Sequence, residues 1–441
     1  MIRFFCLCLL LVVFSCGSDS PSTSGTKTKG LKQDEGTAKM IAILSEAHAN
    51  IDPTKVSYHL NSVKAESYKA QLGQDLNLND KLAAKGKYGN ELLLAGKTHE
   101  AIIEIEQLMA SLKENRVDIR YINHVNKLLA IAYMRLGEQE NCLGKNNSES
   151  CILPIQGEGI YDLTRGPKTA ISLYKSILET EPTDMETIWL LNIAYMTLGE
   201  YPAGVPAQYL IPERAFKSGK EVAPFKNISN DLNLATVALA GGSCIEDFNK
   251  DGFLDIMVSS WGVNDQVQFF VNKGDGSFED RTAETGLLGI TGGLNMVHAD
   301  YNNDGFSDVL VLRGAWFMDQ GRIPNSLLRN NGDGSFSDVT LEAGLFSKYP
   351  TQAATWADFN NDGWLDLFIG NEAGDKIDVP CELFISNKGK FTNVTDQANL
   401  GTIRGVVKGV TSGDLNNDGF TDLYISIMGK NNILMLNKGL A

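Results

Sequence analysis

The feature that most constrains this chain is a nine-residue pattern that occurs four times in its second half. Each copy reads Asp-x-Asn-x-Asp-Gly-x-x-Asp and runs directly into a short apolar segment. The copies begin at Asp247, Asp300, Asp358 and Asp414, which lie 53, 58 and 56 residues apart. A near-constant period of this length is typical of folds that repeat one supersecondary unit. The second half therefore consists of at least four related units.

The residue types in this pattern predict calcium sites. Calcium prefers six to eight oxygen ligands at about 2.3–2.6 Å, from carboxylates, amides and main-chain carbonyls. Side chains at positions 1, 3, 5 and 9 and the carbonyl at position 7 can supply them, and Gly at position 6 permits the sharp turn. Without a cation the three carboxylates would repel one another. The alternative is a set of plain Asp/Asn-Gly turns, and magnesium suits the pattern less well because it keeps more water ligands.

The predicted ligands occupy the odd-numbered positions of each copy. They are Asp247, Asn249, Asp251, Phe253 and Asp255; Asp300, Asn302, Asp304, Phe306 and Asp308; Asp358, Asn360, Asp362, Trp364 and Asp366; and Asp414, Asn416, Asp418, Phe420 and Asp422.

A second pattern follows three of the copies and predicts two strands joined by a glycine turn. It comprises residues 272–282, 330–340 and 387–395. Together with the apolar segments on both sides of the acidic pattern, it gives about four strands per unit, as in the blade of a β-propeller.

At these residues the sequence resembles the FG-GAP or VCBS repeat family, whose calcium loops occur in integrin α-subunit propellers. It is most similar to bacterial and animal proteins of the cartilage acidic protein family. The resemblance covers about residues 222–441 and implies a calcium-binding β-propeller without a defined biochemical activity. Such propellers usually have seven blades, and four are visible here. We expect either a truncated product whose later blades are missing, which we favour, or a four-bladed ring closed by a strand at Phe225–Ser229.

Residues 37–221 are predicted to be helical, because apolar residues recur there at intervals of three and four. Ala170, Tyr174 and Pro182 have the internal spacing of a tetratricopeptide repeat, and Gly96 and Gly137 mark turns between helices. The alternative is a helical bundle without repeats. The region also resembles the tetratricopeptide segment that precedes the propeller in bacterial relatives. The expected fold class is therefore an α-helical tetratricopeptide-like region followed by an FG-GAP-type β-propeller, complete or partial.

The first 16 residues read as an export signal. Arg3 precedes an apolar stretch that is shorter than the roughly 20 residues of a transmembrane helix. Residues 13–16 resemble a bacterial lipobox, which predicts lipidation of Cys16 and anchoring at the outer membrane, on its periplasmic or surface side. An ordinary secretory signal is the alternative. Residues 17–36 are small and polar, as in a flexible tether.

Outside the cytoplasm, the spacing of Cys142 and Cys151 in a polar loop favours a disulfide over a metal site. Cys244 and Cys381 are interpreted as small buried residues.

The net charge and the absence of catalytic motifs restrict the classes of function that this chain can have. The formal net charge of −15 argues against a nucleic-acid partner, and no hydrolase, zinc-protease or P-loop motif is present. Trp261, Arg313 and Trp316 lie in variable inter-strand loops and could form a ligand-binding patch, or could anchor those loops by burial. We expect a calcium-binding, membrane-anchored, non-catalytic binding or scaffold protein of the cell envelope that recognises a protein or glycan. A calcium-dependent polysaccharide-acting enzyme and an adhesion protein are the alternatives.

Overall fold

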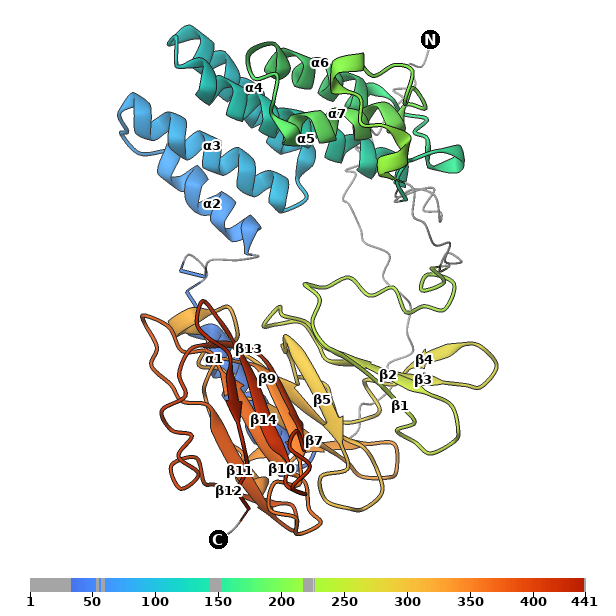
Figure 1. Ribbon diagram of the computed structural model, residues 1–441, viewed down its shortest axis with the longest axis vertical. Coiled ribbons are helices and arrows are strands. Elements are labelled where there is room, and N and C mark those ends of the chain that lie inside the picture. Colours follow the sequence, from blue (N-terminus) through green and yellow to red (C-terminus); the bar gives the residue numbers. More distant parts are fainter. Residues whose placement is uncertain are drawn as a thin grey trace, which may run out of the picture.

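The chain forms an upper lobe of helices and a lower lobe of β-sheets, joined near residue 60 (Figure 1). The computed structural model describes residues 33–52, 55, 56, 60–142, 152–216, 225 and 227–439. An α-helical region followed by antiparallel sheets agrees with the expected order of fold classes. Among the described residues, no helix has both the length and the apolar character needed to span a bilayer.

Consecutive antiparallel helices build the upper lobe. They are α2 (Asn61–Leu72), α3 (Leu78–Leu94), α4 (Thr98–Glu114), α5 (Ile119–Cys142), α6 (Arg165–Thr180) and α7 (Met185–Thr197). Each helix packs against the next along the chain. The side chains of Asn77 and Asp184 cap α3 and α7 by accepting hydrogen bonds from N–H groups of the first turn.

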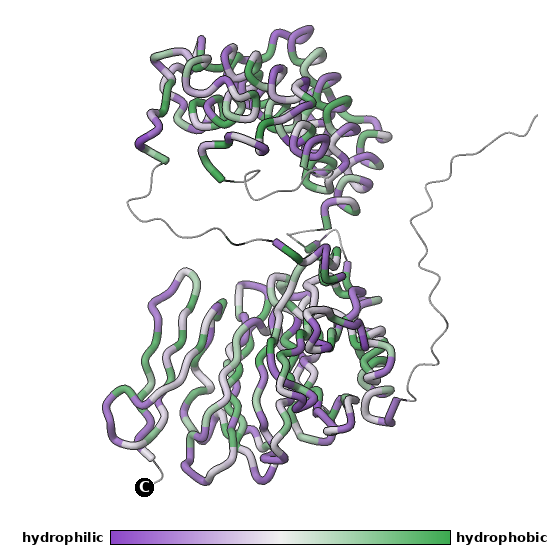
Figure 2. The backbone as a smooth tube through the Cα atoms, turned by 90° about the vertical axis from the view of Figure 1, so that its right-hand side faces the viewer, coloured by the Kyte–Doolittle hydropathy of each residue, from purple (hydrophilic) through white to green (hydrophobic). Residues whose placement is uncertain are grey.

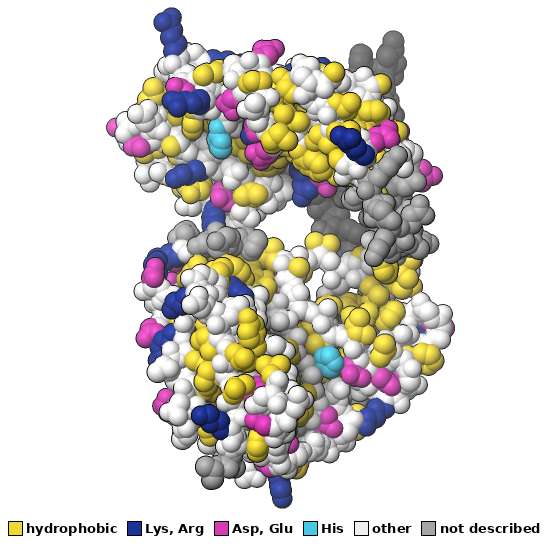
Figure 3. Space-filling view, viewed as in Figure 1, with side chains coloured by type: hydrophobic (Ala, Val, Ile, Leu, Met, Phe, Trp, Pro, Cys, Tyr) yellow, Lys and Arg dark blue, Asp and Glu magenta, His cyan; other side chains and the backbone are white. Residues whose placement is uncertain are grey.

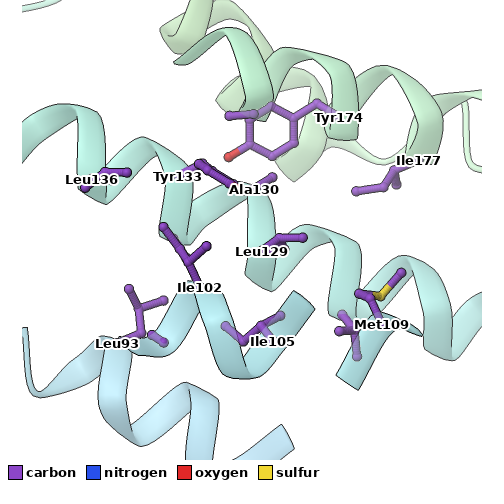
Figure 4. Close-up of a cluster of buried hydrophobic side chains, with 14 of the residues drawn as sticks. Leu93, Ile102, Ile105, Met109, Leu129, Ala130, Tyr133, Leu136, Tyr174 and Ile177 are labelled. Carbon is purple, nitrogen blue, oxygen red and sulfur yellow. The ribbon is translucent and has the colours of Figure 1, made fainter. Parts of the chain in front are cut away.

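The apolar core of the upper lobe runs through all of these helices, and Figure 4 shows the part of it between α3 and α6. Ala130, Tyr174 and Ile177 are fully buried in it. Helices α5 and α6 approach closely because Gly137 and Gly166 meet at their crossing. Gly137 therefore lies within α5, and not in the turn between helices that the sequence predicted. A Cβ atom on Gly166 would lie 2.5 Å from the carbonyl oxygen of Tyr133, so only glycine fits there.

The described residues of the lower lobe form four antiparallel sheets, each built from consecutive strands. The first has β1 (Ser243–Glu246), β2 (Asp255–Val258), β3 (Gln268–Asn272) and β4 (Phe278–Asp280). The second has β5 (Asn295–Ala299), β6 (Asp308–Leu312), β7 (Ser326–Asn330) and β8 (Phe336–Asp338), followed by the short helix α8 (Thr340–Ala343). The third has β9 (Thr351–Ala357), β10 (Asp366–Asn371), β11 (Glu382–Asn387) and β12 (Lys390–Asn393). The fourth has β13 (Val406–Gly413), β14 (Asp422–Met428) and β15 (Ile433–Met435).

The prediction of four strands per unit is thus confirmed for the first three sheets. The first strands of neighbouring sheets lie side by side, β1 with β5, β5 with β9 and β9 with β13. A separate apolar core fills each of the three spaces between neighbouring sheets. Cys244 and Cys381 are buried in these cores, as expected.

Helix α1 (Glu35–Ala49) corrects the expected boundaries, because it belongs to the lower lobe. Its residues Met40 and Leu44 are fully buried in the core between the first two sheets. The Thr37 hydroxyl accepts a hydrogen bond of 2.8 Å from the Asp338 N–H on β8. The Gln33 side chain donates to the Gly286 carbonyl. The helical region therefore does not begin at residue 37, and Asp34, Glu35 and Gly36 form the cap and first turn of α1 rather than part of a tether.

Three predictions concern the N-terminus, the disulfide and the closing strand. The export signal with Cys16 lies outside the described residues, and so does Cys151, the expected disulfide partner of Cys142. Both therefore stay predictions. The described residues of the segment expected to close a four-bladed ring form no strand, and Phe225 is 94% exposed.

Candidate metal centre

Each of the four acidic patterns forms the loop between the first and second strands of its sheet. We call these segments loops 1 to 4 (residues 247–255, 300–308, 358–366 and 414–422). All four loops have the same backbone path. The residue at position 4 is left-handed, with φ between 53° and 60°, and the glycine at position 6 has φ between 86° and 90°. Position 4 is Asn in three loops and Lys250 in loop 1, and Asn tolerates this conformation better than most residues.

The first Asp of each loop organises the turn. In loop 3, Asp358 accepts hydrogen bonds from the N–H groups of Asp362, at 3.1 Å, and Gly363, at 2.8 Å. The same two bonds occur in the other three loops, at 2.7–3.1 Å. The Asn at position 3 accepts from the same N–H as the first Asp, and the Asp at position 5 accepts from the N–H at position 7. The predicted side chains at positions 1, 3 and 5 therefore all line one turn.

The Asp at position 9 is the first residue of the second strand and is buried. Asp255, Asp308, Asp366 and Asp422 are at most 1% exposed. One oxygen of each accepts a bond of 2.7–2.9 Å from an N–H at the end of the third strand or just beyond the short last strand. The second oxygen of Asp255 is buried without a hydrogen-bond partner among the described residues.

Burial and crowding of charge both disfavour ionisation at position 9. Burial, and after it the negative charges of Asp304 and Asp300, together raise the pKa of Asp308 to about 7. The pKa values of Asp255 and Asp366 are raised to about 6 by the same causes, in the same order, while hydrogen bonds from main-chain N–H groups oppose the rise. A cation beside these carboxylates would favour their charged forms.

The loops thus offer a donor set made only of oxygen, from carboxylates, one amide and one carbonyl, which is the ligand chemistry of calcium. Among the residues that the structure describes, no three His, Cys, Asp or Glu side chains converge on a single point in the manner of metal ligands. The carboxylates at positions 1 and 5 instead face the N–H groups of their own turn. Small rotations of exposed side chains would be needed to direct these oxygens at one ion.

Two of the three residues predicted to form a ligand-binding patch are in the interior. Trp261 is 4% exposed, stacks on Phe317 with ring centroids 4.1 Å apart, and donates its indole N–H to the Ala315 carbonyl. Arg313 is 1% exposed and donates to the carbonyls of Thr291 and Pro324. Their burial corrects the expectation of a surface patch and agrees with the alternative that they anchor loops.

Trp316 is half-buried and has partners that the sequence did not reveal. The Lys408 ammonium lies 3.2 Å from the centroid of its indole ring and forms an ion pair with Glu372. Glu372 in turn accepts a hydrogen bond of 2.9 Å from the Trp316 N–H. These three residues come from the second, third and fourth sheets, so no local pattern links them. A lysine in β13, where apolar residues are expected, is the one sequence signal that could have pointed to this cluster.

Comparison with known proteins agrees with the repeat pattern. Residues 247–311 and 315–369 match the family described as FG-GAP-like repeat. These segments include loops 1, 2 and 3, the strands before loops 2 and 3, and all or most of the strand after each loop.

Two curated proteins are similar to part of the chain. Cartilage acidic protein 1 of Xenopus tropicalis is 29% identical over 149 residues, which is 33% of this chain and 21% of that protein. Cartilage acidic protein 1 of Homo sapiens is 27% identical over 159 residues, which is 35% of this chain and 22% of that protein. The similarity thus covers about a third of this chain and about a fifth of the length of these relatives, and it supports the family resemblance expected from the loops.

Proposed function

We propose that this protein is a calcium-stabilised, non-catalytic binding or scaffold protein of the cell envelope. The proposal rests most on loops 1 to 4, which repeat one backbone geometry and one oxygen-rich donor set in four successive sheets. The side chains at positions 1, 3, 5 and 9 and the carbonyl at position 7 would hold the ion in each loop. When bound, calcium would neutralise the clustered carboxylates and hold the first two strands of each sheet together.

The wider architecture in this proposal is a β-propeller segment combined with tetratricopeptide-like helices. Successive four-stranded sheets with their first strands side by side support the propeller. Helices that pack on their chain neighbours, with small residues such as Gly166 at the crossings, support the helical repeat. Anchoring through Cys16 and recognition of a protein or glycan rest on the sequence pattern and on the family resemblance.

Calcium binding is tested by equilibrium dialysis of the full chain and of the Asp362→Ala variant. We expect about four ions per wild-type chain, with dissociation constants of about 0.1–1 mM, as in extracellular calcium modules. The Asp362→Ala variant should bind one ion fewer, because loop 3 loses the carboxylate at position 5.

A matched control is Asp333→Ala, which removes an exposed Asp from the hairpin between β7 and β8. That carboxylate accepts hydrogen bonds only from Ser335 among the described residues. This variant should bind as many ions as the wild type. Absence of saturable calcium binding in the millimolar range, or an unchanged number of ions in Asp362→Ala, would contradict the proposal.

A further inference from the structure

Neighbouring acidic loops are joined by a hydrogen bond that repeats along the chain. The side-chain amide at position 4 of one loop donates to the main-chain carbonyl at position 6 of the next loop. Asn303 of loop 2 donates in this way to Gly363 of loop 3, at 3.1 Å, and Asn361 of loop 3 donates to Gly419 of loop 4, at 2.8 Å. Loops 2, 3 and 4 are therefore linked by one type of contact.

The contact between loops 1 and 2 uses the same positions with different chemistry. Position 4 of loop 1 is Lys250, whose ammonium nitrogen lies 4.1 Å from the centroid of the Phe306 ring at position 7 of loop 2. A Cβ atom on Gly305, at position 6 of loop 2, would lie 2.8 Å from the same nitrogen. Position 4 of each of the first three loops thus reaches the peptide between positions 6 and 7 of the following loop.

That peptide controls two of the predicted ligands in its own loop. In loop 4, the Gly419 carbonyl belongs to the same peptide group as the Phe420 N–H, which donates to the Asp418 carboxylate at 2.9 Å. In loop 3, the Trp364 N–H donates to the Asp362 carboxylate at the same distance. The carboxylate at position 5 and the carbonyl at position 7 are both predicted ligands. An amide that holds this peptide from the preceding loop therefore helps to place both of them.

The donating residue lies between two predicted ligands of its own loop. Positions 3 and 5 flank it, and the amide at position 3 donates to the carboxylate at position 5 at 2.8–3.0 Å in all four loops. The backbone at position 4 is left-handed, with φ of 53° at Asn303 and 58° at Asn361. A cation held by positions 3 and 5 would fix the backbone between them and, with it, the direction of the donated amide.

A second type of contact joins loops 1 and 2 and loops 3 and 4 through a single asparagine. The Asn330 main-chain N–H donates to the buried Asp308 at position 9 of loop 2, at 2.7 Å. The Asn330 side-chain amide donates to the Phe248 carbonyl at position 2 of loop 1, at 2.8 Å. Asn437 makes the same pair of bonds to loops 4 and 3, at 2.8 and 2.7 Å. Each of these residues therefore holds a predicted ligand of one loop and the backbone of the loop before it.

We propose that these contacts couple the ion sites, so that calcium bound in one loop raises the calcium affinity of the neighbouring loops. This coupling presupposes the proposed function, calcium binding by loops 1 to 4, and makes Asn303 and Asn361 positioning residues. An ion in loop 2 orders positions 3 to 5, and the Asn303 amide then holds the peptide of loop 3 in place. Loop 3 loses less conformational entropy when its own ion binds. The effect is reciprocal, since an ion in loop 3 raises the affinity of loop 2 by the same factor.

The charge of the loops permits neighbouring ions to bind together. Each loop has three Asp, so a loop that holds one divalent cation still has a net charge of −1. An ion therefore meets a negatively charged neighbour whether or not that neighbour is occupied. The second oxygen of Asp255 in loop 1 is buried without a hydrogen-bond partner among the described residues, and a cation would supply one. Acidic side chains are visible on the lower part of the β lobe, where the loops lie (Figure 3).

The coupling is tested by calcium titration of the full chain, with loop 3 as the reporter and every substitution in loop 2. Trp364, at position 7 of loop 3, supplies a fluorescence signal for that loop. The Trp364→Phe variant gives the background from the other Trp, because Phe occupies position 7 in loops 1, 2 and 4. The difference between the two titrations yields the calcium concentration at which loop 3 is half saturated.

Asp304→Ala should empty loop 2, because it removes the carboxylate at position 5. We expect loop 3 then to require at least about fivefold more calcium for half saturation. Electrostatics alone predicts the opposite change, since an empty loop 2 with two Asp is more negative than an occupied loop with three. A weaker loop 3 must therefore result from the lost contacts.

Asn303→Gly tests the amide itself. Glycine keeps the left-handed backbone without strain, and the variant keeps all predicted ligands in loops 2 and 3. It should weaken loop 3 by a factor similar to that of Asp304→Ala, and the double variant should be no weaker than Asp304→Ala alone. Equilibrium dialysis should still find as many ions in Asn303→Gly as in the wild type.

The matched control is Asn399→Gly, at an exposed left-handed residue outside the loops, with φ of 57°. This variant should leave the half-saturation of loop 3 unchanged, and circular dichroism checks that each variant keeps its fold. An unchanged or stronger loop 3 in Asp304→Ala overturns the coupling and leaves calcium binding intact. Equal weakening in Asn399→Gly also overturns it. Absence of saturable calcium binding in the dialysis contradicts the proposed function itself, and the coupling with it.

Discussion

The two lobes of this protein are stabilised by different means. In the upper lobe, helices pack through an apolar core and through close contacts at glycine. In the lower lobe, an acidic loop joins the first two strands of each sheet, and main-chain N–H groups hold the buried Asp of that loop. The tube coloured by hydropathy shows hydrophilic turns at the lower edge of the β lobe (Figure 2). The comparison leads us to expect that the stability of the β lobe depends on a bound cation and that the stability of the helical lobe does not.

Removal of calcium should produce the largest difference in thermal stability between the two lobes. An ion that binds only the folded state, present at 100 times its dissociation constant, stabilises by about 2.7 kcal/mol per site. A chelator should therefore lower the unfolding temperature of the β lobe by well over 10 °C, with the helical lobe unchanged. Four of the five Trp lie in the β lobe, so tryptophan fluorescence follows its unfolding, and the circular dichroism signal at the helical minimum follows the helices. Equal shifts of both signals would contradict the comparison.

Shortening of one buried side chain of α1 tests which lobe this helix belongs to. Leu44→Ala should lower the free energy of unfolding of the β lobe by about 3 kcal/mol, because the side chain is fully buried between the first two sheets. Fluorescence-detected urea unfolding measures the loss. The exposed neighbour Ser45 provides the control, since Ser45→Ala should change stability by less than about 0.5 kcal/mol. A loss confined to the helical signal would assign α1 to the other lobe.

Replacement of a small residue by a larger one tests the helix packing of the upper lobe. Gly166→Val should destabilise the helices by about 2–3 kcal/mol, because its Cβ would collide with the backbone of α5. Circular dichroism during thermal unfolding should show the loss, while tryptophan fluorescence of the β lobe stays near the wild-type curve. Gly73→Ala is the matched control. Its Cβ would approach the Ala70 carbonyl oxygen no closer than 3.4 Å, so the variant should unfold like the wild type.

The smallest expected effect concerns pH. Burial, together with the smaller effect of the nearby Arg313 charge, lowers the pKa of His48, at the end of α1, to about 4. The neutral ring is therefore favoured in the folded state, so its contribution is present above pH 6.5 and is lost as the pH falls through about 4. After allowance for partial solvent screening, we expect a loss of about 1 kcal/mol in the β lobe. His48→Gln should remove this part of the acid sensitivity, and an identical pH profile for the variant would contradict the assignment.

The acidic loops were predictable because their information is local. Within nine residues, Gly at position 6 and Asn at position 4 specify the left-handed backbone, and the first Asp finds N–H groups four and five residues ahead. The strands on both sides followed from the same pattern. The place of α1 was not predictable, since an amphipathic helix shows which of its faces is apolar but not what that face will cover.

The three residues predicted to bind a ligand show the same limit of prediction from sequence. Trp261 and Arg313 have the composition of a recognition patch, yet both are buried, and Trp316 finds its partners Lys408 and Glu372 in other sheets. Aromatic and guanidinium groups suit a ligand surface and an interior anchor equally well. Only the path of the surrounding chain decides between the two.

The sequence by itself determined the order of the two regions, the four acidic loops and the strands that they join. These features depend on contacts between residues close together in the chain, so their pattern is readable without the fold. The tertiary structure alone decided that α1 completes the core of the β lobe and that two of the three predicted binding residues lie inside. Those outcomes depend on which surfaces meet after residues far apart in sequence are brought together, and hydrophobic packing fixes them without leaving a local signature.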